Sequence, residues 1–451
     1  MKRDKRQPAK ARNIRESISV RIANYLVAIV LALVPFHAFL TVWASSMLHG
    51  GYDLLRLWTL AVLIVLTAIV GWWMVQDRAL LRWLGDNFLI RLALLYSLLT
   101  LILGVVAVLF GTVSPKAFAI GEFLNIRFIL FFVLVVVVAH KSDWLLERWR
   151  LLLLVPGLAV VLFAILQYFA LPITFLGHFG YGPDTIPAYS TINNNKEYIR
   201  VASTLRGPNP LGAYLVILIS ALAVSLRGYY LSDVFRRAVY LCLAFAALLF
   251  SFSRSAWLGV VLALVVYGFV IATSKRLRII LAIVLLGFGV VSVGAYALAQ
   301  HNRTVQNAIF HTDDDSTIAK SSNDQRIDAQ ADSINLAADN AFGIGVGSAG
   351  PASVYNQPHH AVITENYFLQ LALEVGWSGL LVFLFLLAGL AGYLWSVRDK
   401  LLAVALLMSL AGITLINLLS HAWTDETLAF TWWGLAGVAV GTSASVRKKR
   451  K

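Results

Sequence analysis

Five arginines and a pair of adjacent histidines are the residues of this sequence best suited to chemistry. They are Arg127, Arg200, Arg206, Arg254, Arg326, His359 and His360. A guanidinium group stays charged and grips phosphate oxygens through two parallel hydrogen bonds. A neutral imidazole accepts protons near neutral pH. Together these residue types indicate a site that binds a phosphate-bearing anion and removes a proton from a second reactant.

The arginines lie beside turns that connect apolar runs. Arg200 and Arg206 enclose a short segment, and Gly207, Pro208 and Pro210 then fix a turn and open a helix. The free N–H groups and dipole of a helix N-terminus favour anions, although lipid phosphates are an alternative ligand for both arginines. Arg254 lies in a connection so short that its guanidinium must snorkel, pair with an acid or meet a ligand.

Arg127 lies six residues inside an apolar run, and Arg326 begins a helix predicted near 323–340. For Arg127, pairing with Glu122 is the alternative to ligand binding. Arg200, Arg206, Arg254 and Arg326 come from three separate segments, so we expect them to converge on one anion.

The candidate bases lie in the segment 358–366. His359 and His360 are the preferred general bases, and Glu365 is the alternative. No cluster of cysteines or carboxylates accompanies the histidines, and three successive acids at 313–315 are usually solvated, so we expect no metal and no cofactor. The glycines of 343–347 resemble a nucleotide-binding loop, but they follow no predicted strand, so nucleotide binding is not expected.

The composition is that of an integral membrane protein. Hydrophobic residues make up 59% of the 451 residues, charged residues only 13%, and the mean hydropathy is +0.76. The formal charge of +14 comes from short basic clusters beside apolar runs, which indicates topology determinants and not nucleic-acid binding. The single Cys242 excludes a disulfide framework. Tryptophans near span ends, including Trp432 and Trp433, are typical of interfacial belts.

Twelve apolar runs are long enough for membrane spans. They lie at about 22–47, 54–75, 88–111, 121–139, 151–171, 210–226, 237–252, 256–273, 278–299, 367–396, 401–420 and 428–445. Threading them from a cytoplasmic N-terminus puts most basic residues, including the terminal 447–451, on the cytoplasmic face. We therefore expect both termini to be cytoplasmic. A signal peptide is the alternative for the first run, which is too long for one.

One membrane domain, residues 1–451, is expected, with two long outer loops at 172–209 and 300–366. The second loop contains a capping-box pattern at Ser322–Gln325. Ile327, Ile334 and Ala338 share one face of the helix that follows. The pattern predicts an amphipathic outer helix that packs on the bundle or on headgroups, and a solvated helix is the alternative.

The segment from about 196 to 380 resembles the O-antigen ligase family. That family shares a superfamily with O-antigen polymerases and bacterial protein O-oligosaccharyltransferases. The resemblance rests on Arg200 with Arg206-Gly-Pro-Asn-Pro-Leu-Gly, Ser253-Arg254-Ser, Arg326 before Gly-Ile-Gly-Val-Gly, and Asn366-Tyr-Phe-Leu-Gln with Glu374 and Gly376. One departure is that many relatives have His-Asn where this chain has Glu365-Asn366, so either Glu365 or an earlier histidine is the base.

The resemblance implies an all-α, GT-C-like membrane enzyme with about twelve transmembrane helices and two long periplasmic loops. It implies transfer of O-antigen glycan from undecaprenyl pyrophosphate to lipid A–core oligosaccharide at the periplasmic face of the inner membrane. We expect the reaction to invert the anomeric configuration of the transferred sugar and to need no metal. Its pyrophosphate-binding residues are expected to be Arg200, Arg206, Arg254, Arg326 and Arg127. The expected partners are the two glycolipids and membrane lipids, without nucleic acid, and the protein is expected to be a monomer.

Two other functions remain open at the level of sequence. An O-antigen polymerase would use a second carrier-linked glycan as its acceptor. A protein acceptor is disfavoured because the sequence ends six residues after the last predicted span. A secondary transporter would suit twelve spans, with Pro35 or Pro156 in broken helices, but the ionisable residues gather at the outer edge and not at the midplane.

Overall fold

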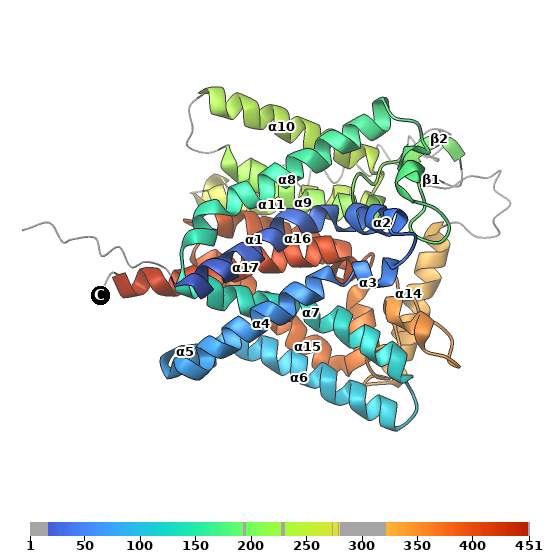
Figure 1. The fold of residues 1–451 in the computed structure, drawn as a ribbon, viewed down its shortest axis with the longest axis horizontal. Coiled ribbons are helices and arrows are strands. Elements are labelled where there is room, and N and C mark those ends of the chain that lie inside the picture. The colour runs from blue at the N-terminus through green and yellow to red at the C-terminus, as the bar shows by residue number, and fades with distance from the viewer. Residues whose placement is uncertain are drawn as a thin grey trace, which may run out of the picture.

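Runs of apolar residues form the long helices of the computed structural model (Figure 1). The structure describes residues 17–192, 195–226, 231–272, 274–277, 279 and 322–449. Within these residues, eight helical segments are long and apolar enough to cross a membrane. They are α1–η1–α2 (Ile18–Met47), α3–α4 (Tyr52–Gln76), α6 (Phe88–Leu109), α7 (Pro115–Lys141), α8 (Trp144–Phe169), α9 (Pro208–Ser225), α11 (Arg254–Ile271) and α15 (Tyr367–Ser396).

Further elements complete the bundle. They are α5 (Arg78–Asp86), η2 (Phe175–Phe179), β1 (Ser190–Ile192), β2 (Asn195–Arg200), α10 (Leu231–Phe250), α14 (Ser322–Asp339), η4 (Gly350–Tyr355), α16 (Leu401–Asn417), η5 (Ala422–Thr424) and α17 (Glu426–Lys449). The expectation of an all-α membrane protein is confirmed. The count of twelve stays a prediction: three further expected spans fall on α10, α16 and α17, and 278–299 lies outside the described residues.

The long helices run back and forth between two distinct ends of the bundle (Figure 1). One end carries α14 and the small antiparallel hairpin of β1 and β2, in which Ser190 pairs with Arg200. The opposite end carries α5 and the C-terminal end of α17. The turns that connect α8 to α9, α10 to α11 and α16 to α17 all lie at the first end, which we call the hairpin end.

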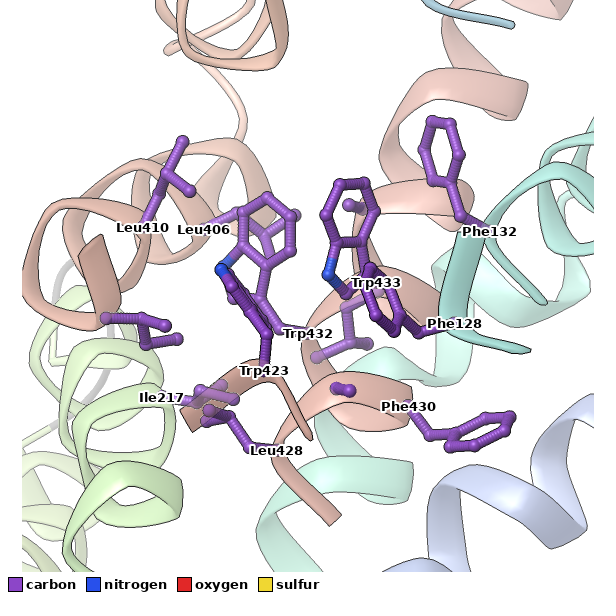
Figure 2. Close-up of a cluster of buried hydrophobic side chains, with 14 of the residues drawn as sticks. Phe128, Phe132, Ile217, Leu406, Leu410, Trp423, Leu428, Phe430, Trp432 and Trp433 are labelled. Atoms are coloured by element: carbon purple, nitrogen blue, oxygen red, sulfur yellow. The ribbon is translucent and has the colours of Figure 1, made fainter. Parts of the chain in front are cut away.

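A cluster of aromatic side chains forms the core between α7, α16 and α17 (Figure 2). The rings of Trp432 and Trp433 meet edge to face with centroids 5.2 Å apart, and Phe128 lies 5.3 Å from Trp433. Trp432 and Trp433 are fully buried, so the prediction that they belong to an interfacial belt is wrong. Trp423, in the turn between α16 and α17, packs against both rings and anchors that turn to the core. Such aromatic pairs contribute about 0.5–1.5 kcal/mol each beyond their burial.

The outer helix predicted at 323–340 is present as α14, which crosses the hairpin end of the bundle (Figure 1). Its packing differs from the prediction, because Ser333 and Ala337 are buried while Ile327 and Ile334 are exposed. The indole Nε1 of Trp377 donates to the carbonyl oxygen of Ala337 at 3.1 Å. The face that meets the bundle is therefore the one with small and polar residues, and it also carries Arg326.

The glycine-rich loop after α14 enters a break in α15. Gly376 has φ of 67° inside α15, and the amide of Trp377 donates instead to the carbonyl of Ala341 at 3.1 Å. The buried carboxylate of Glu374 accepts from the amide of Gly347 at 3.0 Å. A Cβ at Gly347 would collide with the backbone of α7, so glycine is required for this close approach. The loop thus packs against α7 and α15, and this packing holds α14 over the hairpin end.

Candidate functional site

Arg200 ends β2 and turns its guanidinium toward the connection between α10 and α11. Its Nε donates to the carbonyl of Ser251 at 3.1 Å, and its Nη2 donates to Asn209 Oδ1 at 2.7 Å. A longer contact of 3.4 Å reaches the carbonyl of Phe252. These acceptors are neutral dipoles, so they orient the guanidinium without cancelling its charge.

Arg254 and Arg326 lie within electrostatic range of Arg200. Burial lowers the pKa of the Arg200 guanidinium to about 10, and the positive charges of Arg326 and Arg254 contribute to this lowering. Arg200 remains charged at neutral pH. We call these residues, which come from β2, α11 and α14, the arginine set. The folded chain therefore holds three like charges from distant segments close together.

Glu365 supplies the carboxylate beside this set. Its Oε2 lies 3.5 Å from Arg326 Nε, and both side chains are about one-third exposed. The Gln330 side chain donates to the carbonyl of Glu365 at 3.1 Å. Asn366, the next residue, caps α15 by accepting from the amide of Phe368 at 2.9 Å. The carboxylate is thus fixed at the start of a membrane helix and remains accessible from the hairpin end.

Backbone strain gathers around the same residues. In the described part of the chain, four non-glycine residues have positive φ, and three flank the site: Ser203 at 53°, Phe252 at 47° and Glu365 at 48°. Non-glycine residues in this region of backbone space cost on the order of 1–3 kcal/mol each, and such residues cluster at functional sites. Three strained positions beside one group of arginines therefore support a functional role for it.

Arg206 lies next to Arg200 and is mostly exposed. Its Nε is 3.9 Å from Asp425 Oδ2, which is a long ion pair for an exposed side chain. Arg200 and Arg206 line one small pocket, together with Gln167 of α8 and residues of the loop after α8, including Tyr181. The structure thus brings Arg206 beside Arg200 at the entrance to the site.

Arg127 lies in a different environment. Its Nη1 is 3.0 Å from Glu426 Oε2, and its Nη2 donates to the carbonyl of Thr424 at 2.7 Å. Glu426 also lies 3.5 Å from His37, and the side chains of Arg127 and Glu426 are 5% and 13% exposed. Arg127 thus forms an ion pair, as the alternative interpretation proposed, but its partner is Glu426 and not Glu122. We leave Arg127 out of the anion site.

The preferred histidines lie beside another turn. His359 Nε2 is 3.3 Å from the carbonyl of Gly111, between α6 and α7, and both His359 and His360 are exposed. No contact described for either histidine reaches the arginine set. Of the three candidate bases, Glu365 contacts a member of the arginine set, namely Arg326.

His421 is a candidate that the sequence analysis missed. It lies in the turn between α16 and α17, and its Nε2 is 2.9 Å from Thr364 Oγ1. Burial lowers the pKa of His421 to about 4, and the nearby charge of Arg326 acts in the same direction. The sequence places it at the end of an apolar run without a motif, although Ser420, Thr424 and Asp425 form a polar group around it.

Within the described residues, no group of three or more His, Cys, Asp or Glu side chains gathers as a metal site would require. The acidic run 313–315 lies outside the described residues. The arginine set at the hairpin end is instead combined with the carboxylate of Glu365. Such a site can hold a phosphorylated anion and take up a proton beside it.

Comparison with known proteins adds an independent result. Residues 239–384 match a family model described as O-antigen ligase, and this range contains Arg254, Arg326 and Glu365. A comparison with curated proteins finds no match to the chain. The matched range runs from α10 into α15, and it includes the glycine-rich loop and the start of α15 that carry part of the site. Over this segment, the chain is similar to the O-antigen ligase family.

Proposed function

We propose that the protein is a glycosyltransferase that moves O-antigen glycan from undecaprenyl pyrophosphate to lipid A–core oligosaccharide. The observation that carries this proposal is the convergence of Arg200, Arg254 and Arg326 beside Glu365. The family match supports the general class, a membrane protein that acts on lipid-linked glycans.

The arginine set is suited to a diphosphate. Three guanidinium groups repel one another, and a bound anion with several negative charges removes that repulsion. Each guanidinium can hold two oxygens at once, which orients the diphosphate as well as binding it. When the bond between sugar and phosphate breaks, negative charge grows on the leaving phosphate. Arginines that are already in place stabilise this charge without rearrangement.

Glu365 is the proposed general base. An acceptor hydroxyl oxygen attacks the anomeric carbon, the bond from that carbon to the phosphate oxygen breaks, and the carboxylate takes the hydroxyl proton. Attack from the face opposite the leaving group inverts the anomeric configuration. Arg326 pairs with Glu365 at 3.5 Å in the structure. When Arg326 turns to the diphosphate, the carboxylate becomes a stronger base, so donor binding prepares the site for the acceptor.

The proposed location of the reaction is the periplasmic face of the inner membrane. The hairpin end lies opposite the end at which α17 finishes (Figure 1). Arg447, Lys448 and Lys449 belong to that last turn, and basic residues favour the cytoplasmic side. A periplasmic hairpin end brings the arginine set to the leaflet where a finished, carrier-linked glycan is presented.

Glycan transfer with purified components tests the proposal. The full-length protein is mixed with undecaprenyl-pyrophosphate-linked glycan and lipid A–core oligosaccharide in the presence of EDTA. We expect a lipid A–core conjugate with the wild type. Arg254→Ala should lower the rate by at least about a hundredfold, since loss of one preorganised donor to developing charge has that effect.

Arg148→Ala is the matched control, because Arg148 is an exposed arginine on α8 at the opposite end of the bundle. It should retain the wild-type rate. Wild-type activity in Arg254→Ala would refute the proposed site. A longer carrier-linked glycan without any lipid A–core conjugate would identify a polymerase instead.

A further inference from the structure

The hydrogen bonds around Thr364 fix the tautomer of His421. The Thr364 hydroxyl donates its single proton to the carbonyl of Asn366 at 2.7 Å. It cannot also donate to His421 Nε2, which lies 2.9 Å away, so the imidazole must be the donor in that contact. His421 thus carries a proton on Nε2 and uses it to hold the Thr364 side chain.

Two further contacts tie the segment around Glu365 to the turn between α16 and α17. The amide of Tyr367 donates to the carbonyl of Ser420 at 3.2 Å. The Gln330 side chain donates to the carbonyl of Glu365 and, at 3.4 Å, to the carbonyl of Leu418. Glu365, with its strained backbone, therefore lies between an anchor at Thr364, just before it, and an anchor at Tyr367, two residues after it.

The turn that provides these anchors is itself rigid. The amide of Trp423 donates to Asn417 Oδ1 at 3.1 Å, and the Thr424 hydroxyl donates to the carbonyl of His421 at 2.7 Å. Trp423 is buried among the aromatic side chains of α17 (Figure 2). Because the turn is held by the core, the position of His421 is fixed, and its hydrogen bond fixes the Thr364 side chain in turn.

We propose that His421 is a positioning residue: its Nε2–H holds Thr364, and thereby keeps Glu365 in the left-handed backbone conformation that directs the carboxylate toward Arg326. This inference rests on the proposed function, in which Glu365 is the base. A neutral imidazole suits the role, because a charged one would repel Arg326. Burial in this turn keeps His421 neutral at physiological pH.

Three substitutions separate this role from its alternatives. His421→Leu removes the donor, Thr364→Val removes the hydroxyl with little change in shape, and His421→Gln keeps an N–H donor near the position of Nε2. In the transfer assay described above, we expect the Leu and Val variants to lose roughly tenfold or more in kcat, with an unchanged KM for the carrier lipid. His421→Gln should stay within about threefold of the wild type.

The Gln variant decides the outcome. If it is as slow as the Leu variant, the imidazole does more than donate to Thr364 and the positioning role is overturned. Wild-type kcat in Thr364→Val would overturn it as well, and this variant remains informative if His421→Leu fails to fold. The double variant His421→Leu/Thr364→Val should be no slower than either single variant, because both remove the same contact. Arg254→Ala, measured alongside, reports separately on the proposed function.

Discussion

Arg127 is buried and Arg200 is partly buried, and these two arginines near the hairpin end have opposite surroundings. Arg127 contacts the carboxylate of Glu426 at 3.0 Å and lies within a network that includes His37. Arg200 is oriented by carbonyl oxygens and an amide, and the positive charges of Arg326 and Arg254 act on it. The first guanidinium is neutralised by the protein, whereas the second is oriented and left positive.

The difference separates Arg127, which completes an internal ion pair, from Arg200, which we propose binds an anion. A buried pair such as Arg127 and Glu426 gives little net stability, but removing one partner leaves a buried charge. A positive charge held by neutral dipoles and repelled by its neighbours becomes more favourable when an anion arrives. Substitutions at the two arginines should therefore affect different quantities.

Arg127→Met should have the largest effect, and the effect should be on stability. The free energy of unfolding should fall by about 3–5 kcal/mol, because Glu426 would remain buried without its partner. Thermal unfolding in detergent measures this change. The double variant Arg127→Met/Glu426→Gln should recover part of the loss. A stable Arg127→Met protein without transfer activity would place Arg127 in the anion site and remove the contrast.

Acidification should have the second largest effect, and this effect should also be on the free energy of unfolding. Because the pKa of His421 is about 4 in the folded protein and ordinarily 6.5, the unfolded chain binds a proton that the folded chain excludes. The stabilisation is complete above about pH 6.5 and is lost as the pH falls toward 4, by about 3 kcal/mol. Unfolding curves at several pH values measure it. His421→Gln should show a shallower loss over this range, and identical slopes for the two proteins would contradict the expectation.

Arg200→Lys tests whether Arg200 acts through its charge alone or also through the geometry of its guanidinium group. Lysine keeps the positive charge but cannot donate to Ser251 and Asn209 in the fixed fork geometry of arginine. We expect transfer to slow by roughly tenfold to a hundredfold, which corresponds to about 1.4–2.7 kcal/mol, with little change in stability. Steady-state kinetics and thermal unfolding of the same preparation test both parts. An unaltered rate would mean that charge alone suffices.

Arg206→Ala should have the smallest effect. The side chain is 61% exposed and lies 3.9 Å from Asp425, and exposed pairs of this kind contribute less than about 1 kcal/mol to stability. Transfer should slow only by about threefold. A loss as large as that of Arg254→Ala would show that Arg206 belongs with the arginine set.

The sequence predicted the features that depend on local pattern. Apolar runs indicated the membrane helices, and the capping pattern at Ser322 predicted the outer helix found at α14. Of the motifs that suggested a family, those between Ser253 and Gly376 lie within the match over residues 239–384, whereas Arg200 and the Arg206 motif lie outside it. The predicted topology also drew attention to Arg200, Arg254 and Arg326, because it placed them on the outer side, where arginines are unusual.

The features that the sequence could not predict depend on contacts between distant residues. Glu426 lies about three hundred positions from its partner Arg127, and no local pattern relates them. Trp432 and Trp433 occur in an apolar run whose side chains are hydrophobic all round, so its periodicity does not show which faces neighbouring helices cover. His421 and Thr364 meet only because α15 and the turn after α16 are adjacent at the hairpin end.

The position of that turn in the chain has a consequence for biogenesis. Ser420 and His421 precede α17, and they support the segment that begins α15. A nascent chain inserted only as far as α15 therefore has its arginines and its carboxylate but no support for the carboxylate. Under the proposed function, competence for transfer should arise only after the turn before α17 has been inserted, so that partly synthesised chains do not discharge the carrier lipid.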